Sequence, residues 1–151
     1  MFLALLTDEQ KKVFFCLAHD VVVSDGELSV GEQVMMEDMR REMNLSPDFE
    51  AHYLPLDGVD TVFDSKRSQA TVLISLIRLA YADGAFEIEE QFLIKSLCTL
   101  FNTTDADLYL MENWVRRLIA LEREANGFMW KDNNMQPTDS YFPRLRLVSD
   151  R

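Results

Sequence analysis

Hydrophobic side chains recur every three to four residues in the first part of the chain, which is the spacing of one face of an α-helix. This pattern covers residues 8–24 and then residues 30–43. The capping-box sequences Thr7-Asp-Glu-Gln10 and Ser29-Val-Gly-Glu32 stand at the two starts. Asp25-Gly26 separates the runs, and glycine ends helices readily because it accepts a left-handed backbone. The pattern therefore predicts two helices joined as a hairpin.

The helical pattern continues to about residue 124. Residues 66–82 are apolar on nearly every side, which predicts a central and heavily buried helix that ends at Asp83-Gly84. Further helices are predicted over residues 87–101 and 105–124. Residues 44–65 contain two prolines and predict a short helix after Ser46 followed by an irregular connection.

The apolar stripes of the second and fourth long helices identify their expected core residues. In the segment 30–43 they are Val34, Met35, Met39 and Met43. In the segment 87–101 they are Phe92, Leu93, Leu97, Cys98, Leu100 and Phe101. Core packing is the favoured role for this methionine-rich stripe, because methionines at helical spacing usually face the interior.

The first hairpin repeats later in the chain. Aligning Asp25-Gly26 with Asp83-Gly84 gives an offset of 83 − 25 = 58 residues. At this offset the matching pairs are Leu28 and Phe86, Glu32 and Glu90, Gln33 and Gln91, Met39 and Leu97, Met43 and Phe101, and Asn44 and Asn102. Two similar hairpins can share one core by packing about a pseudo-two-fold axis.

The expected fold class is therefore all-α, a helical bundle of six to seven helices built from two pseudo-two-fold-related helical hairpins. Residues 1–124 form the predicted domain. Residues 125–151 form a predicted irregular tail, because glycine, asparagine and proline interrupt them, and their aromatic side chains are expected to hold them on the domain.

The composition narrows the classes of partner. The chain has 26 acidic and 15 basic residues, a formal net charge of −11, so it should repel nucleic acid and anionic membrane surfaces and leave cations and basic partners open. No segment reaches the roughly 20 apolar residues of a membrane-spanning helix.

Cys16 and Cys98 lie in apolar runs and fit a reducing, cytoplasmic location. His19 and His52 are predicted to be isolated from both cysteines, which disfavours a zinc site.

Four acidic residues of the repeat are candidate ligands. A pseudo-two-fold axis would bring both Asp-Gly corners to one end of the bundle and gather Asp25, Glu32, Asp83 and Glu90. Clustered carboxylates repel one another unless a proton or a cation lies among them. Their hard oxygen atoms favour Ca²⁺, Mg²⁺ or Mn²⁺. The sequence thus raises the hypothesis of a divalent-cation site.

The repeated element Ala-x-x-Asp-Gly-x-hydrophobic-x-x-x-Glu, at 22–32 and 80–90, resembles the TerB-like family. That family includes tellurite-resistance proteins and the N-terminal module of DjlA-type co-chaperones. The resemblance implies an all-helical fold, an acidic candidate cation-binding site at the four carboxylates, no established catalysis and a bacterial stress-response setting. Apart from the resemblance, we expect an unidentified protein partner. Val22 stands where the second copy has Ala80, and no DnaJ-like segment is present, which weakens a co-chaperone role.

Other interpretations of these acids remain open. Asp25 and Asp83 can serve as turn residues, and Glu32 can cap its own helix. An EF-hand is disfavoured because Val21 and Val23 stand where oxygen ligands are required. Three functions therefore remain: a cation-binding module, a metal-independent protein-interaction or scaffold module, and a metal-dependent hydrolase. No nucleophile–base motif supports an enzyme.

Overall fold

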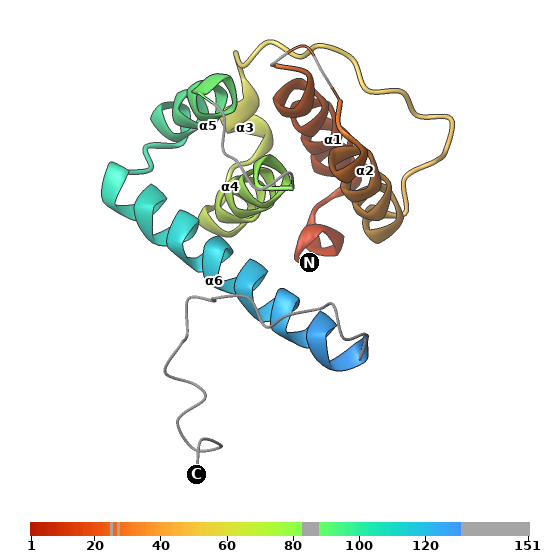
Figure 1. Ribbon diagram of the computed structural model, residues 1–151. Helices are drawn as coiled ribbons and strands as arrows, with labels where there is room; N and C mark the ends of the chain where they lie inside the picture. Colours follow the sequence, from red (N-terminus) through yellow and green to blue (C-terminus); the bar gives the residue numbers. More distant parts are fainter. Residues whose placement is uncertain (25, 27, 83–87, 131–151) are drawn as a thin grey trace. The chain divides into compact units, whose positions relative to one another are not determined.

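The structure is a computed structural model that describes residues 1–24, 26, 28–82 and 88–130. The all-α prediction is confirmed, since these residues form six α-helices and one short 3-10 helix and contain no strand (Figure 1). The elements are η1 (Leu3–Leu5), α1 (Asp8–Val23), α2 (Val30–Met43), α3 (Val59–Val62), α4 (Lys66–Ala80), α5 (Ile88–Phe101) and α6 (Asp105–Met129). No helix among them combines the length and apolar character needed to cross a bilayer.

The chain forms two compact units, Met1–Met111 and Glu112–Arg151. The first contains both hairpins and the start of α6. The second contains the rest of α6, which runs to Met129 instead of ending near residue 124. Residues 125–129 are therefore helical and not irregular as predicted. Gly127 disfavours a helix only mildly, and the helix-forming residues around it outweigh this preference. The remainder of the predicted tail, residues 131–151, lies outside the described residues.

The helix ends reproduce the predicted repeat in the backbone. Capping boxes open α1 at Thr7 and, 58 residues later, α4 at Ser65. The second helix of each hairpin is followed by an asparagine with a left-handed backbone, Asn44 with φ of 55° and Asn102 with φ of 58°. After each, an N–H donates back to a helix carbonyl, over 3.1 Å to Arg40 and over 2.8 Å to Cys98. These two carbonyls are also 58 residues apart.

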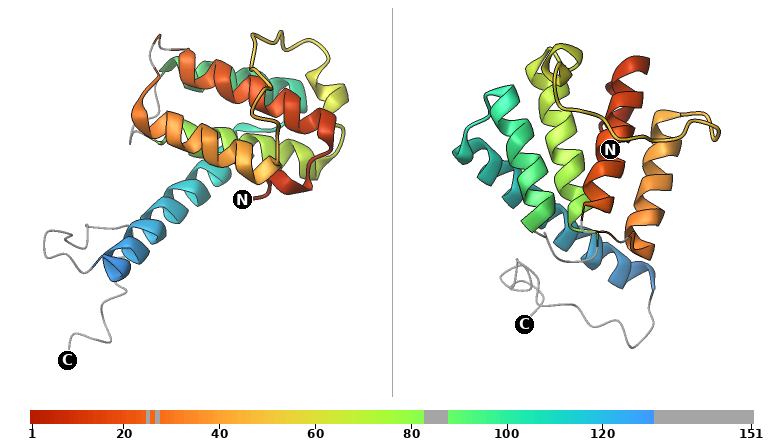
Figure 2. Two further views of the ribbon diagram at one scale, coloured as in Figure 1. Left: turned by 90° about the vertical axis from the view of Figure 1, so that its right-hand side faces the viewer. Right: turned by 90° about the horizontal axis from the view of Figure 1, so that it is seen from above.

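The two hairpins, α1–α2 and α4–α5, pack in a reciprocal way. Helix α1 contacts α4, while α2 contacts α4 and α5 contacts α1. Seen from above in the right view of Figure 2, α1 and α4 lie side by side between α2 and α5. This exchange of contacts is what a pseudo-two-fold axis produces, and it places the first helix of each hairpin at the centre of the first unit.

The core follows the predicted stripes in part. Helix α4 is heavily buried, as predicted, with Val72, Leu73, Leu76, Ile77 and Leu79 inaccessible to solvent. The core residues of α2 are Met36, Met39 and Met43, and those of α5 are their repeat equivalents Ile94, Leu97 and Phe101, with Cys98. The predicted core residues Met35, Leu93 and Leu100 are only half-buried. The assignment of Val34 and Phe92 to the core is wrong, since both are exposed. These two residues lie two positions before the first core residue of their helix, which places them on its opposite face.

The connection between the hairpins also differs from the prediction. After Ser46 the chain makes a single turn, with the Phe49 N–H donating to the Ser46 carbonyl over 3.1 Å, and no helix forms there. The Arg40 guanidinium bonds the carbonyls of Ser46 and Phe49, which a helix would need for itself. Residues 45–57, here called the strap, then cross α1 without regular structure, and the short helix comes later as α3.

Candidate functional site

The helix ends that flank both Asp-Gly corners are neighbours. Val23 and Ser24 at the end of α1 line the same groove as Ile88 and Glu89 at the start of α5. The left view of Figure 2 shows α1 and α4 running in the same direction, so both hairpins turn at the same end of the bundle. Asp25 and Asp83 themselves lie outside the described residues. The flanks nevertheless lie where the repeat predicted them.

The two glutamates of the predicted cluster are buried. Glu32 is 3% exposed and Glu90 is 2% exposed. The Glu32 carboxylate accepts the Ser29 N–H over 3.0 Å, and the Glu32 N–H donates to the Ser29 hydroxyl over 3.0 Å. The capping interpretation of Glu32 is therefore confirmed, and at least one of its carboxylate oxygens already accepts a hydrogen bond from the cap of its own helix. Glu90 occupies the equivalent place in the first turn of α5.

Metal binding at the four carboxylates stays a prediction. Within residues 1–24, 26, 28–82 and 88–130, no three His, Cys, Asp or Glu side chains are grouped closely enough to hold a metal ion. Two of the four proposed ligands, Asp25 and Asp83, fall outside those ranges. The described geometry thus establishes the position of Glu32 and Glu90 and leaves the complete ligand set open.

A large apolar groove lies beside the corner end. Its volume is about 690 Å³, and its walls come from the end of α1, the strap and the start of α5. The lining residues are Asp20, Val23, Ser24, Tyr53, Leu54, Leu56, Ile88, Glu89, Phe92, Leu93 and Ser96. Ile88 is 78% exposed and Phe92 is 74% exposed, and Val23 and Tyr53 are also exposed. Three segments distant in sequence therefore present one apolar surface to solvent.

Asp20 fixes the strap at the edge of this groove. Its carboxylate accepts the Leu54 N–H over 3.2 Å. Burial raises the pKa of the Asp20 carboxyl above its ordinary value, while the hydrogen bond from Leu54 and the nearby His19 and His52 act in the opposite direction. Asp20 is thus a partly desolvated acid that holds the backbone of the strap.

The structure places a cysteine and a histidine in contact that the sequence analysis predicted to be separate. The Cys16 sulfur lies 3.8 Å from Nδ1 and 4.0 Å from Nε2 of His52 on the strap. The prediction that the histidines are isolated from the cysteines is wrong for this pair. The 36 intervening residues carry no motif, and only the path of the strap across α1 creates the contact. Cys16 is buried, so the contact serves packing.

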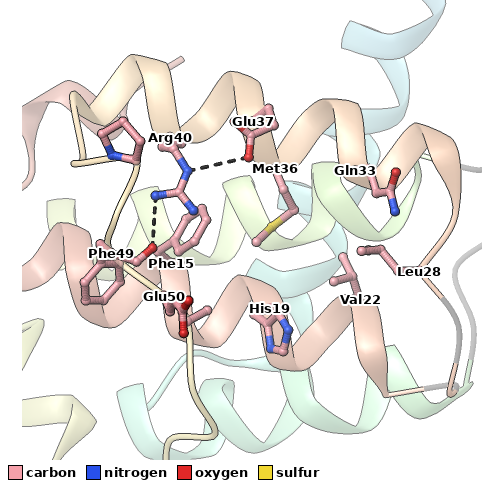
Figure 3. Close-up of a pocket in the computed structure, with 12 residues that line it drawn as sticks. Phe15, His19, Val22, Leu28, Gln33, Met36, Glu37, Arg40, Phe49 and Glu50 are labelled. Atoms are coloured by element: carbon pink, nitrogen blue, oxygen red, sulfur yellow. Dashed lines mark hydrogen bonds and ion pairs between the residues drawn. The ribbon is translucent and has the colours of Figure 1, made fainter.

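A second cavity of about 500 Å³ lies between α1, α2 and the first part of the strap (Figure 3). Arg40 crosses it with its guanidinium 4.5 Å from the centre of the Phe15 ring. It donates to the carbonyls of Ser46 over 2.6 Å and Phe49 over 3.1 Å and pairs with Glu37 over 3.5 Å. Arg40 therefore serves to clasp the strap. Among described residues, the buried Nδ1 of His19 on the cavity wall has no hydrogen-bond partner.

Comparison of the chain with protein-family models, with curated proteins and with solved structures found no match. The function is therefore inferred from the residues and their geometry.

Proposed function

We propose that this protein is a non-enzymatic protein-binding module of the TerB-like type, and that the groove between α1, the strap and α5 is its docking surface. The observation that carries the proposal is the exposure of Val23, Tyr53, Ile88 and Phe92 around one cavity of about 690 Å³. Contiguous exposed apolar surface of this kind marks interaction sites, whereas single exposed hydrophobic residues need no explanation.

The arrangement on α5 strengthens this proposal. Ile88 and Phe92 are four residues apart and so lie on one face of the helix, next to each other. Burying apolar surface that is now exposed to water stabilises by about 25 cal/mol for every Å² that is buried. A partner that covers the groove recovers this free energy without any rearrangement of the core, because none of these side chains belongs to it.

The same geometry disfavours enzymatic activity. The Cys16 sulfur lies 3.8 Å from Nδ1 of His52, a pairing of the nucleophile–base kind, but Cys16 is only 2% exposed. A substrate could not reach its sulfur, and a catalytic nucleophile must be reachable.

The repeat supplies a matched control for a test of this proposal. Val30 and Val34 are the 58-residue equivalents of Ile88 and Phe92 and are 77% and 57% exposed, yet they line neither the groove nor the second cavity. The double variants I88D/F92D and V30D/V34D therefore make the same change at equivalent helix positions. Both should fold like the wild type, because all four side chains face solvent.

The experiment is selection of a displayed random-peptide library on the wild-type protein. Enriched peptides should bind I88D/F92D about tenfold more weakly or worse, since loss of a central apolar anchor typically costs at least that much. The same peptides should bind V30D/V34D within about twofold of the wild type. A library that yields no peptide dependent on Ile88 and Phe92 would contradict the proposal.

A second candidate function is divalent-cation binding at the paired corners. It is supported by the burial of Glu32 and Glu90 at equivalent positions of one end of the bundle. Ca²⁺, Mg²⁺ or Mn²⁺ at millimolar concentration should then raise the melting temperature of chelator-treated protein, and the Asp25→Asn/Asp83→Asn variant should lose the rise. A melting temperature that no cation changes would remove this candidate, and with it the metal-dependent hydrolase. The bacterial stress-response setting rests on the resemblance alone, whereas the cytoplasmic location is inferred from Cys16 and Cys98.

A further inference from the structure

We infer that the groove recognises a basic amphipathic helix of a partner protein, one with large apolar side chains on one face and Lys or Arg beside them. This inference rests on the proposed function and specifies the chemistry of its partner.

The acidic charge of the chain is concentrated in the unit that carries the groove. Residues 1–111 contain 8 Lys and Arg against 20 Asp and Glu, a formal charge of 8 − 20 = −12. Residues 112–151 contain 7 basic and 6 acidic residues, a formal charge of 7 − 6 = +1. A field of this sign attracts a basic partner to the first unit and repels an acidic one.

The groove itself has the same polarity. Its described charged residues are both acidic, Asp20 on α1 and Glu89 on α5, and no Lys or Arg is found among them. The cationic side chains of a bound apolar segment would lie near one carboxylate on each helical wall, Asp20 on α1 and Glu89 on α5. A segment that brings carboxylates would have to place them beside Asp20 and Glu89 in a partly desolvated site, which is unfavourable.

The form of the walls favours a helix as the bound segment. Ile88 and Phe92 project from α5 as a ridge of residues four apart, and the end of α1 forms the facing wall. Ridges of this spacing pack into the grooves of another helix. The described residues contain no sheet edge to which an extended peptide could add as a strand. A short helix with apolar residues at every third and fourth position fits this geometry.

The test uses the full-length protein and three labelled synthetic peptides with identical Leu and Phe positions and Lys, Gln or Glu at the remaining positions. Fluorescence anisotropy at about 50 mM salt should show the Lys peptide binding about tenfold more tightly than the Gln peptide. The Glu peptide should not bind detectably. The preference for Lys should shrink at about 500 mM salt, because salt screens exposed charges.

Variants then locate the preference. Asp20→Asn/Glu89→Gln should lose most of the preference for the Lys peptide over the Gln peptide. Glu9→Gln/Asp60→Asn removes the same charge at exposed sites outside the groove and should keep the preference. A preference that survives in the first variant, or that the second abolishes equally, would overturn the inference, since it would arise from the general field of the unit.

The failure of this inference and the failure of the proposed function give different results. Equal binding of the Lys and Gln peptides, lost in I88D/F92D, would overturn the basic partner and leave the docking surface in place. If instead the protein self-associates in light scattering and I88D/F92D does not, the occupant is a second copy of the chain and the inference is overturned. Binding of all peptides that I88D/F92D leaves unchanged would overturn both.

Discussion

The two hairpins of the first unit share the same backbone features at their helix ends, but different segments of the chain follow them. Both end their second helix at a left-handed asparagine, and both expose an apolar pair at the start of that helix. They differ in the segment that comes after the asparagine. Directly after Asn44 the strap begins, whereas after Asn102 the chain starts α6 at Asp105.

This difference shows that the groove is a property of the strap as much as of α5. The exposed pair of α2 lines neither the groove nor the second cavity, while the pair of α5 faces Tyr53, Leu54 and Leu56 of the strap and forms one wall of the groove. The clasp of the strap is also specific to the first copy. Arg40 holds it, and the residue at the equivalent position of the second copy is Cys98. Four measurements test how far the equivalence of the hairpins extends.

The largest effect is expected from Arg40→Ala. This change removes a cation–π contact and two hydrogen bonds from a charged donor to carbonyls of the strap. The free energy of unfolding should fall by about 2 kcal/mol, as measured by urea denaturation. The control is Arg41→Ala, whose exposed pair with Asp38 should cost less than about 0.5 kcal/mol. Equal losses in the two variants would show that Arg40 does not clasp the strap.

A smaller and symmetric effect is expected at the two asparagines. Asn44→Ala and Asn102→Ala should each lower the free energy of unfolding by about 1 kcal/mol, because alanine is disfavoured in the left-handed region. Glycine at either position should restore the stability, since it adopts this conformation without strain. Thermal denaturation of the four single variants provides the measurement. A loss at one asparagine alone would contradict the equivalence of the hairpins.

A pH-dependent effect is expected at Asp20, where the strap meets the groove. Because the pKa of its carboxyl is raised on folding, its stabilising contribution is present below the unfolded pKa near 3.8 and is lost as pH rises through the folded pKa. Asp20→Asn keeps an oxygen for the Leu54 N–H. It should therefore gain stability relative to the wild type as the pH rises above about 4 in paired melting curves, and a difference that stays constant with pH would refute this.

The smallest effect is expected at the thiol of Cys98. Burial, and then the negative charge of Asp105, raises its pKa to about 11. At about pH 8 the Cys98 thiol should remain protonated and hardly react with a disulfide reagent, because the thiolate is the reactive species. Denatured protein should react quickly at both cysteines. Rapid labelling of Cys98 in a Cys16→Ala variant of the folded protein would contradict the burial seen in α5.

The sequence predicted the local structure well because local structure has local causes. The capping boxes at Thr7 and Ser29 and the apolar period of α4 depend on residues within a few positions of one another, and all were found as expected. The repeat further predicted the reciprocal packing of the hairpins. The same signals could not place the apolar residues Val34 and Phe92 on an outer face, because hydrophobicity alone does not reveal which face a neighbour covers.

The features of the candidate site that the sequence missed depend on contacts between distant residues. No pattern links Cys16 to His52 or Arg40 to the carbonyls of the strap, since side chains reach backbone groups whatever their sequence. The groove was missed for this reason, as its walls come from residues 20–24, 53–56 and 88–96. The candidate carboxylates, in contrast, could be identified from the sequence because they recur with the repeated helices. Glu32 and Glu90 lie at the expected end of the bundle, where both hairpins turn.

The paired asparagines have a consequence for how this protein can change. Asn44 and Asn102 set the length of each hairpin through the backbone, while Ile88 and Phe92 contribute to the surface and not to the core. Under the proposed docking function, different residues therefore determine folding and recognition. Substitutions in the groove would then alter the choice of ligand at little cost in stability, and the exposed pair Val30 and Val34 would offer a site at which to engineer a second specificity.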